Sequence, residues 1–326
     1  MELRQLRYFL EILEAGSLSR AATSLYIAQP ALSQQMQKLE AELGTPLLTR
    51  SARGVTPTDA GRRLALHARH ILEQVEQAGH VARDAGSTIG GVVAVGLPRS
   101  IQQWLGLDLL QAARAQLPGV QLRLADGPSG WLTEQLAEGR LDLAMLFETR
   151  RTRGLALQAI FEEPLLLFGP PGTLRGRGPI PPAAAAALPL ILLSRPSDIR
   201  DQLDRLWERD NLQPRIVAEI DSPPLLLRAV QAGLGYAVLP ASSLEDAETQ
   251  EPVDTAALAA PGLVRTASLA TSRLFPLAPA ADAIRSLLLE LLQERLRLRA
   301  ASSARGPMPV LADPSPPNPP DTESRP

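Results

Sequence analysis

The stretch from Gly16 to Leu43, GSLSRAATSLYIAQPALSQQMQKLEAEL, constrains the fold more than any other part of the chain. Ser17 is a suitable N-cap for a short helix, and Pro30 suits the first turn of a second one, where its missing N–H costs no hydrogen bond. We therefore predict two helices joined by a tight turn. A helix before them ends at Gly16, and its predicted buried stripe contains Leu3, Leu6, Leu10 and Leu13, with Phe9 and Ile12 beside it.

The helix after the turn has two chemically different faces. Leu32, Met36, Leu39 and Leu43 recur at steps of four, three and four, which predicts a buried face. The opposite face carries the uncharged side chains of Gln29, Pro30, Ser33, Gln34 and Gln37. Glutamine and serine can hydrogen-bond to base edges in a DNA major groove. The alternative is a solvated polar face, but the position after a short helix and a turn favours a recognition helix.

A short hairpin follows, with strands expected at 45–50 and 55–57 around a turn that contains Gly54. Arg50 and Arg53 are expected to face the DNA backbone or an adjacent minor groove from this wing. The alternative is an ordinary surface hairpin. Residues 1–58 are accordingly predicted to form a winged helix-turn-helix domain.

A long helix is predicted over residues 59–84 of a linker segment that spans 59–89, with Thr58 as its cap. Its apolar residues alternate at steps of four and three, which is typical of a coiled-coil seam and predicts a homodimer. The alternative is a helix packed on its own domain. All three histidines lie in this helix and are interpreted as surface residues rather than metal ligands. The predicted seam contains Leu64, Ala68, Ile71, Val75, Ala78 and Ala82.

The first sixty residues resemble the LysR-type transcriptional regulators through LRQLRYFLEILEAGSLSRAATSLYIAQPALSQQMQKLEAELGTPLLTR and RGVTPTDAG. The segment IAQPALSQQ followed by RGVTPT looks most like the nitrogen-assimilation-control branch. Leu48 stands where many members have phenylalanine, and Gln34 where many have arginine. The resemblance implies DNA contacts by the side chains of Gln29, Pro30, Ser33, Gln34, Arg50 and Arg53.

Residues 90–300 alternate strand-like and helical runs, which implies an α/β domain with a parallel or mixed sheet. Strands are expected near 92–96, 120–125, 141–147, 155–160, 165–168, 190–193, 215–220 and 236–239, and a last helix at 282–298. The LysR resemblance implies a two-lobed, periplasmic-binding-protein-like effector domain. Effectors of such sheets bind beyond the carboxyl ends of strands. The residues expected there are Arg99, Ser100, Gln102, Ser129, Phe147, Glu148, Arg195, Ser197 and Ser222.

Two alternatives stay open for this cleft. Each serine can be a simple N-cap, and each arginine a surface charge. The prolines beside Arg99 and Ser222 also allow a shallow cleft that binds nothing, and the nitrogen-assimilation-control branch is thought to act without a small effector. The segment 301–326 holds eight prolines and is expected to be a disordered tail.

The chain has no cysteine, which excludes thiol catalysis and fits a reducing cytoplasm. It has no apolar run long enough to cross a membrane, and no catalytic constellation, so neither an enzyme nor a cofactor is expected. The leading prediction is a homo-oligomeric regulator, a dimer or tetramer, that binds double-stranded promoter DNA and works with RNA polymerase and a small effector. The alternatives are a cytoplasmic solute-binding protein without a DNA function and an effector-independent LysR-type regulator.

Overall fold

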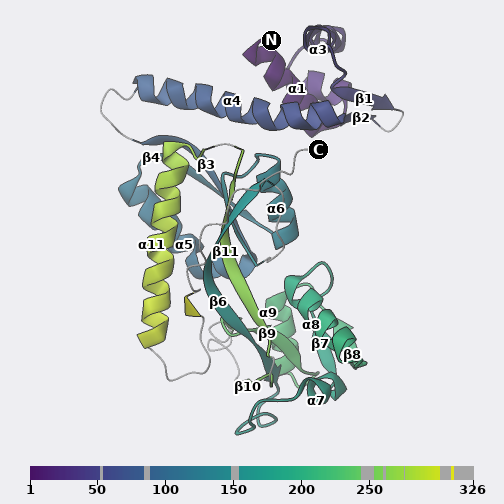
Figure 1. Ribbon diagram of the computed structural model, residues 1–326, viewed down its shortest axis with the longest axis vertical. Helices are drawn as coiled ribbons and strands as arrows, with labels where there is room; N and C mark the ends of the chain where they lie inside the picture. The colour runs from purple at the N-terminus through teal and green to yellow at the C-terminus, as the bar shows by residue number, and fades with distance from the viewer. Residues whose placement is uncertain are drawn as a thin grey trace, which may run out of the picture.

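The computed structural model describes residues 1–51, 54–83, 89–147, 154–243, 253–259, 262–274, 276–301 and 310–311. Figure 1 shows three parts, in chain order: a small helical domain, the long helix α4, and a larger domain of two lobes. The larger domain contains an eight-stranded sheet in the order β10-β6-β11-β5-β3-β4, to which β9 and β12 add by pairing with β6, and a separate two-stranded sheet of β7 and β8.

The first domain is a three-helix unit followed by a hairpin, as predicted. Gly54 has a φ of +120°, and a Cβ there would lie 2.6 Å from the carbonyl oxygen of Gly16, so only glycine lets the hairpin approach the end of the first helix. The neighbouring Val55 N–H donates to that oxygen at 2.9 Å. The elements are α1 (Leu3–Ala15), α2 (Leu18–Ser24), α3 (Gln29–Leu43), β1 (Leu48–Ser51) and β2 (Gly54–Pro57).

The buried stripes of this domain are shorter than the sequence predicts. Phe9, Ile12 and Leu32 are fully buried in its core. Leu3 and Leu43 keep 41% and 39% of their surface exposed, so the expectation that both are buried was wrong. The reason is position: Leu3 opens α1 and Leu43 closes α3, where each helix extends past its neighbours.

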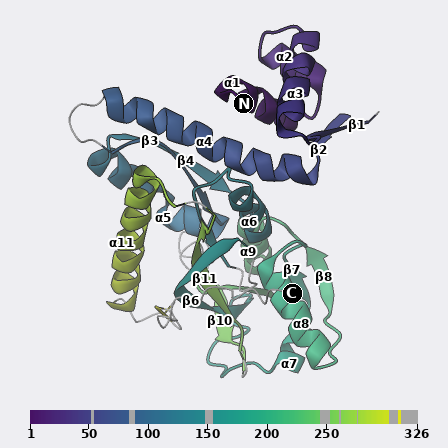
Figure 2. The same cartoon turned by 45° about the horizontal axis from the view of Figure 1, so that its top comes forward.

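Helix α4 (Asp59–Arg83) begins as predicted, because the Thr58 Oγ1 accepts from the Gly61 N–H at 3.0 Å. It contacts α1 on one side and β3 of the larger domain on the other. Figure 2 shows α4 crossing between the two domains. The helix therefore joins the small helical domain and the larger domain by direct packing.

The lobe next to α4 is built on a parallel core. Strand β3 pairs in parallel with both β4 and β5, which buries β5 on both faces. The helices α5 and α11 form one core with the sheet, with Leu105, Met145 and Ile284 among its fully buried side chains. Helix α6 packs in a second apolar cluster of this lobe through Leu132 and Leu136. The elements are β3 (Gly90–Leu97), α5 (Arg99–Gln116), β4 (Gly119–Asp126), α6 (Ser129–Ala137), β5 (Leu143–Leu146) and α11 (Pro279–Ala301).

Two long antiparallel strands, β6 (Leu155–Gly169) and β11 (Val264–Ser272), run from this lobe into the second one. The sequence suggested two separate strands at 155–160 and 165–168, but they form the single strand β6. The polar pair Glu162-Glu163 interrupts the apolar pattern in its middle, and the ion pair made by Glu163 explains how the strand continues through it. Strand β11 was not predicted.

The second lobe has its own core of apolar side chains, with Leu190, Trp207 and Val238 among them. The short strands β7 and β8 pair in parallel, while β9 and β10 pair with the far end of β6. The elements are α7 (Pro182–Ala187), β7 (Leu190–Leu192), α8 (Asp198–Arg209), β8 (Ile216–Glu219), α9 (Pro223–Gln231), β9 (Ala237–Pro240) and β10 (Asp254–Ala257).

The tail is described at one point beyond α11. Strand β12 (Val310–Leu311) pairs antiparallel with Phe161 and Glu162 of β6. The prediction of a disordered tail was wrong for these two residues, because their backbone groups complete an edge of the sheet. Ala301, also assigned to the tail, is the last residue of α11, and residues 302–309 and 312–326 lie outside the described residues.

Candidate nucleic-acid interface and ligand cleft

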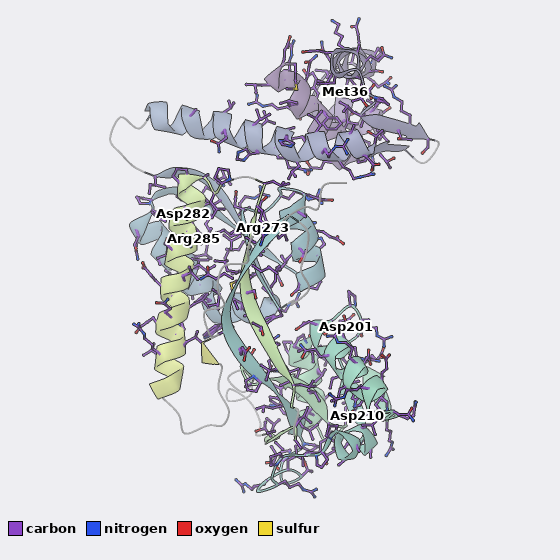
Figure 3. The ribbon with its side chains drawn as sticks, in the orientation of Figure 1. Met36, Asp201, Asp210, Arg273, Asp282 and Arg285 are labelled. Carbon is purple, nitrogen blue, oxygen red and sulfur yellow. The ribbon has the colours of Figure 1, made fainter. Side chains whose placement is uncertain are left out.

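The outward face of α3 is the first candidate site. Gln29, Pro30, Gln34 and Gln37 are exposed and Ser33 is half-buried, while Leu32, Met36 and Leu39 hold the other face in the core. Figure 3 labels Met36 on this helix. Pro30 lies in the first turn, as expected. The helix is thus anchored on one side and presents uncharged hydrogen-bonding side chains on the other.

The wing lies next to this face. Arg50 on β1 is exposed, and its Nη1 donates to the Ser33 Oγ at 3.3 Å. This contact brings together two residues that the sequence predicted to touch DNA from different elements. Arg53 lies outside the described residues.

Tyr26 was not singled out from the sequence as a functional residue. It occupies the turn before α3 with a φ of 55°, and 95% of its side chain surface is exposed. A large side chain held in the open beside a recognition helix can contact the nucleic acid backbone. Its signal in the sequence was only its position in the predicted turn.

The predicted seam of α4 divides into a covered half and an open half. Leu64 packs with the core of the first domain, and Ala68 is fully buried within the single chain. Both side chains therefore pack against their own chain and are not available to a partner subunit. In this half of α4 the helix packs on its own domain, as the alternative interpretation predicted. Val75 and Ala78 are exposed, Ile71 is half-buried, and the side chain of Ala82 lies outside the described residues.

Helix α4 also contacts the first lobe through its middle. Arg69 donates to the carbonyl oxygen of Glu138, and a Cβ on Gly139 would lie 3.1 Å from Leu66. Burial and the neighbouring His67 lower the pKa of His70, while burial raises the pKa of Asp142 even though the Ala94 N–H donates to it at 2.7 Å. The described residues include no cluster of three or more His, Asp or Glu side chains that could hold a metal.

The second candidate site is a cleft of about 1040 Å³ between the lobes. This volume is large enough to hold a small molecule. Three of the residues predicted at the effector site line it: Ser129 at the start of α6, Phe147 after β5, and Ser197, which caps α8. Trp131, Glu134, Asp198, Asp201, Arg205 and Thr266 are among the other lining residues.

The remaining predicted effector residues have other positions. The Arg99 Nε donates to Asp126 at 3.1 Å and the Arg195 Nε donates to Asp204 at 3.0 Å, so both arginines are committed to ion pairs at the surface. Ser222 opens α9, and none of these three lines the cleft. The Gln102 Oε1 is buried without a hydrogen-bond partner, and Glu148 lies outside the described residues.

The base of the cleft, beneath its lining residue Phe147, holds a buried arginine that the sequence did not point to. The Nε and Nη2 of Arg265 donate to the Glu163 Oε2 at 2.9 and 2.7 Å, and both side chains are buried. The guanidinium lies 3.6 Å from the centre of the Phe147 ring, and its Nη2 also donates to the Ser100 Oγ at 3.3 Å. Ser100 and Phe147, both predicted at the site, therefore meet at this arginine.

Both the helical domain and the two-lobed domain match known protein families. Residues 3–62 match the bacterial regulatory helix-turn-helix proteins of the lysR family, and residues 86–293 match the LysR substrate binding domain. The chain belongs to the LysR family. Its helix-turn-helix match contradicts the alternative of a solute-binding protein without a DNA function. This LysR-type chain is a DNA-binding regulator of transcription and not an enzyme.

Two similar proteins are the nitrogen assimilation regulatory proteins nac of Escherichia coli and Klebsiella aerogenes. The LysR-type chain is 36% identical to the first over 296 residues, which cover 90% of this chain and 95% of the relative. It is 37% identical to the second, over 89% of this chain and 95% of the relative. The predicted resemblance to the nitrogen-assimilation-control branch is thereby confirmed.

Solved structures agree with the fold. A full-length OxyR variant from Pseudomonas aeruginosa matches with a TM-score of 0.68 at 24% identity, over 90% of this chain and 95% of that one. CbnR in complex with its target DNA matches with a TM-score of 0.51 at 26% identity, over 89% and 99% of the two chains. No helix within the described parts of the LysR-type chain is long and apolar enough to span a membrane.

The arginine at the base of the cleft shows why sequence reasoning missed part of the site. Arg265 and Glu163 are 102 positions apart, and Arg265 lies on β11, a strand that the pattern of residues did not predict. Asp198 and Trp131 follow N-cap positions, where they look like ordinary first-turn residues of a helix.

Proposed function

We propose that this LysR-type regulator reads promoter DNA through the exposed face of α3. Gln29, Pro30, Ser33, Gln34 and Gln37 face the bases, and Arg50 and Arg53 hold the phosphate backbone. The observation that carries the proposal is the contact between Arg50 and Ser33, which joins a cationic wing to an uncharged recognition face. Uncharged side chains on such a face select bases, whereas arginine on the wing binds every sequence.

Two copies of the chain pair through the open half of α4, where Ile71, Val75 and Ala78 are available. A two-fold dimer binds two half-sites at once, so the binding free energies of both copies contribute to recognition of the promoter. In this proposal residues 1–58 bind DNA, 59–89 link and pair the subunits, 90–300 regulate, and 301–326 form the tail. The protein acts in the cytoplasm, where promoter DNA and RNA polymerase are available to it.

The cleft supports regulation by a small molecule. A hollow of about 1040 Å³ lined from both lobes can change the angle between the lobes when it is filled, and α4 packs directly against the first lobe. A ligand in the cleft would thus alter the spacing of the two recognition helices. The relatives named for nitrogen assimilation suggest promoters of nitrogen-metabolism genes as the first to be tested.

Footprinting of the intergenic region beside the gene tests the proposal, with purified full-length protein at low and moderate salt. We expect protection of two half-sites separated by about one helical turn or a multiple of it. Protection of a single short site, or equal affinity for promoter and random DNA at moderate salt, would contradict a paired base reader.

A further inference from the structure

The acidic and basic side chains that line the cleft differ in whether they already form ion pairs. Glu134, Asp198 and Asp201 line it with no ion pair to any described residue. Of the two arginines that line it, Arg209 donates to its neighbour Asp210 at 2.7 and 3.0 Å. Arg205 is the one cation lining the cleft that makes no ion pair within the described part of the chain. Carboxylates therefore outnumber available guanidinium groups.

Among the acidic residues that line the cleft, Asp198 has a carboxylate oxygen that lacks a hydrogen-bond donor. Its Oδ2 is buried and has no hydrogen-bond partner. Burial raises the pKa of this carboxyl, and the charge of Arg265 acts in the opposite direction. The residue lines the cleft, so a cation placed there stabilises the ionised carboxylate against the cost of its burial.

Trp131 offers a second feature that favours a cation. One face of its ring packs on Gly127, where a Cβ would lie 2.5 Å from the Cε3 atom, and 42% of the side chain surface is exposed. The open indole is part of the cleft lining. An ammonium or guanidinium group over an indole face is attracted by the ring quadrupole.

The groups that usually bind anions, a helix N-terminus and a buried arginine, already have acidic side chains beside them in this protein. The first turn of α8 would attract an anion, but it carries Asp198 and Asp201 itself. Arg265 would attract a carboxylate, but it is held by Glu163 and covered by Phe147. A carboxylate ligand would therefore meet more repulsion than attraction in this cleft.

We infer that the cleft binds a small cationic molecule, with a primary ammonium or guanidinium group held between Asp198 and Trp131 and with Asp201 as a second acceptor. The inference rests on the regulatory role proposed for the cleft and names the chemical class of its ligand. Figure 3 labels Asp201, which lies in the first turn of the second lobe's helix α8. Asp221, which follows β8 in the same lobe, is exposed and lies outside the cleft lining, so it provides a matched control.

The test is the thermal unfolding of the full chain with probes that differ only in charge. Benzylamine is compared with benzoate, and 1,4-diaminobutane with succinate, at equal concentration and ionic strength. We expect at least one amine, at several times its Kd, to raise the Tm by roughly 2–4 °C and both carboxylates to leave it unchanged. A larger shift with a carboxylate, or no shift with either amine, would overturn the inference.

Variants then locate the effect. Asp198→Asn and Asp201→Asn should each at least halve the amine shift, whereas Asp221→Asn, the same change outside the cleft lining, should keep it. Asp201 is exposed, so its variant tests the site without a risk to folding. An unchanged amine shift in both cleft variants would place the amine elsewhere and refute the assignment.

Promoter binding without amine separates this inference from the proposed function. The cleft variants should shift the promoter fragment as the unchanged protein does, because neither aspartate lies in the DNA-reading domain. If the unchanged protein binds the promoter but shows no amine response, the ligand class is wrong and the DNA function stands. If the unchanged protein does not bind the promoter, the proposed function itself fails.

Discussion

Arg50 on the wing donates to the hydroxyl of Ser33 on α3 across 3.3 Å, so the cationic and the uncharged parts of the interface form one continuous surface. In the proposed function the two residues serve different purposes. Arginine neutralises phosphate whatever the sequence, whereas serine and its glutamine neighbours can distinguish bases. Their separate effects can be measured.

Replacement of Gln29 by alanine should weaken binding to the specific promoter site by about 1–3 kcal/mol, because a base-reading side chain is lost. Binding to random DNA should change little. Competition gel shifts with specific and random fragments measure both. Gln103→Ala, a change at an exposed position on α5, serves as the control. An equal loss on both fragments would show that Gln29 contacts the backbone.

Replacement of Arg50 by alanine should lower affinity for specific and random DNA together. The slope of log affinity against log salt should fall by about 1, because one phosphate contact is lost. Ser33→Ala, by contrast, should leave that slope unchanged. A salt series in the gel shift distinguishes the two variants, and an unaltered slope for Arg50→Ala would remove this residue from the phosphate contacts.

The two halves of α4 predict opposite results for the same substitution. Ala78→Asp places a charge on an exposed surface and should shift the protein from dimer to monomer in sedimentation, with the fold intact. Ala68→Asp buries a charge inside the chain and should lower the Tm strongly. If Ala78→Asp sediments as the unchanged dimer at micromolar concentration, the pairing surface lies elsewhere.

Much of the architecture was predictable because it depends on local patterns. The recognition helix has buried residues at helical spacing and a proline in its first turn, and these signals suffice to locate it. The sequence predicted one continuous dimer seam along α4, but only part of it is exposed. The same alternation of apolar residues packs on its own chain at Leu64 and lies on an exposed surface at Ala78. The base of the cleft was not predictable, because Glu163 and Arg265 meet only after two distant strands have paired.

Removal of one partner of the Glu163–Arg265 ion pair at the base of the cleft should strongly lower the free energy of unfolding. Glu163→Gln leaves the buried Arg265 without its counter-charge and should cost about 3–5 kcal/mol of unfolding free energy. The double change Glu163→Leu with Arg265→Met removes both charges and should recover most of that loss. Denaturant unfolding of the unchanged protein and of these two variants measures the difference. A double variant as unstable as the single one would mean that the pair itself supplies the stability.

The contact of α4 with the first lobe predicts a pH effect below pH 6.5. The pKa of His70 is lowered in the folded chain by burial and by His67, so the folded state binds fewer protons than the unfolded state does. Stability therefore falls as the pH drops below the ordinary histidine pKa of 6.5, and this loss should be smaller in His70→Gln. The raised pKa of Asp142 acts in the opposite sense near pH 4, where protonation favours the folded state. Measuring Tm from pH 5 to 8 isolates the histidine, since Asp142→Asn should alter that range far less. A His70→Gln profile parallel to that of the unchanged protein would exclude this histidine as the titrating group.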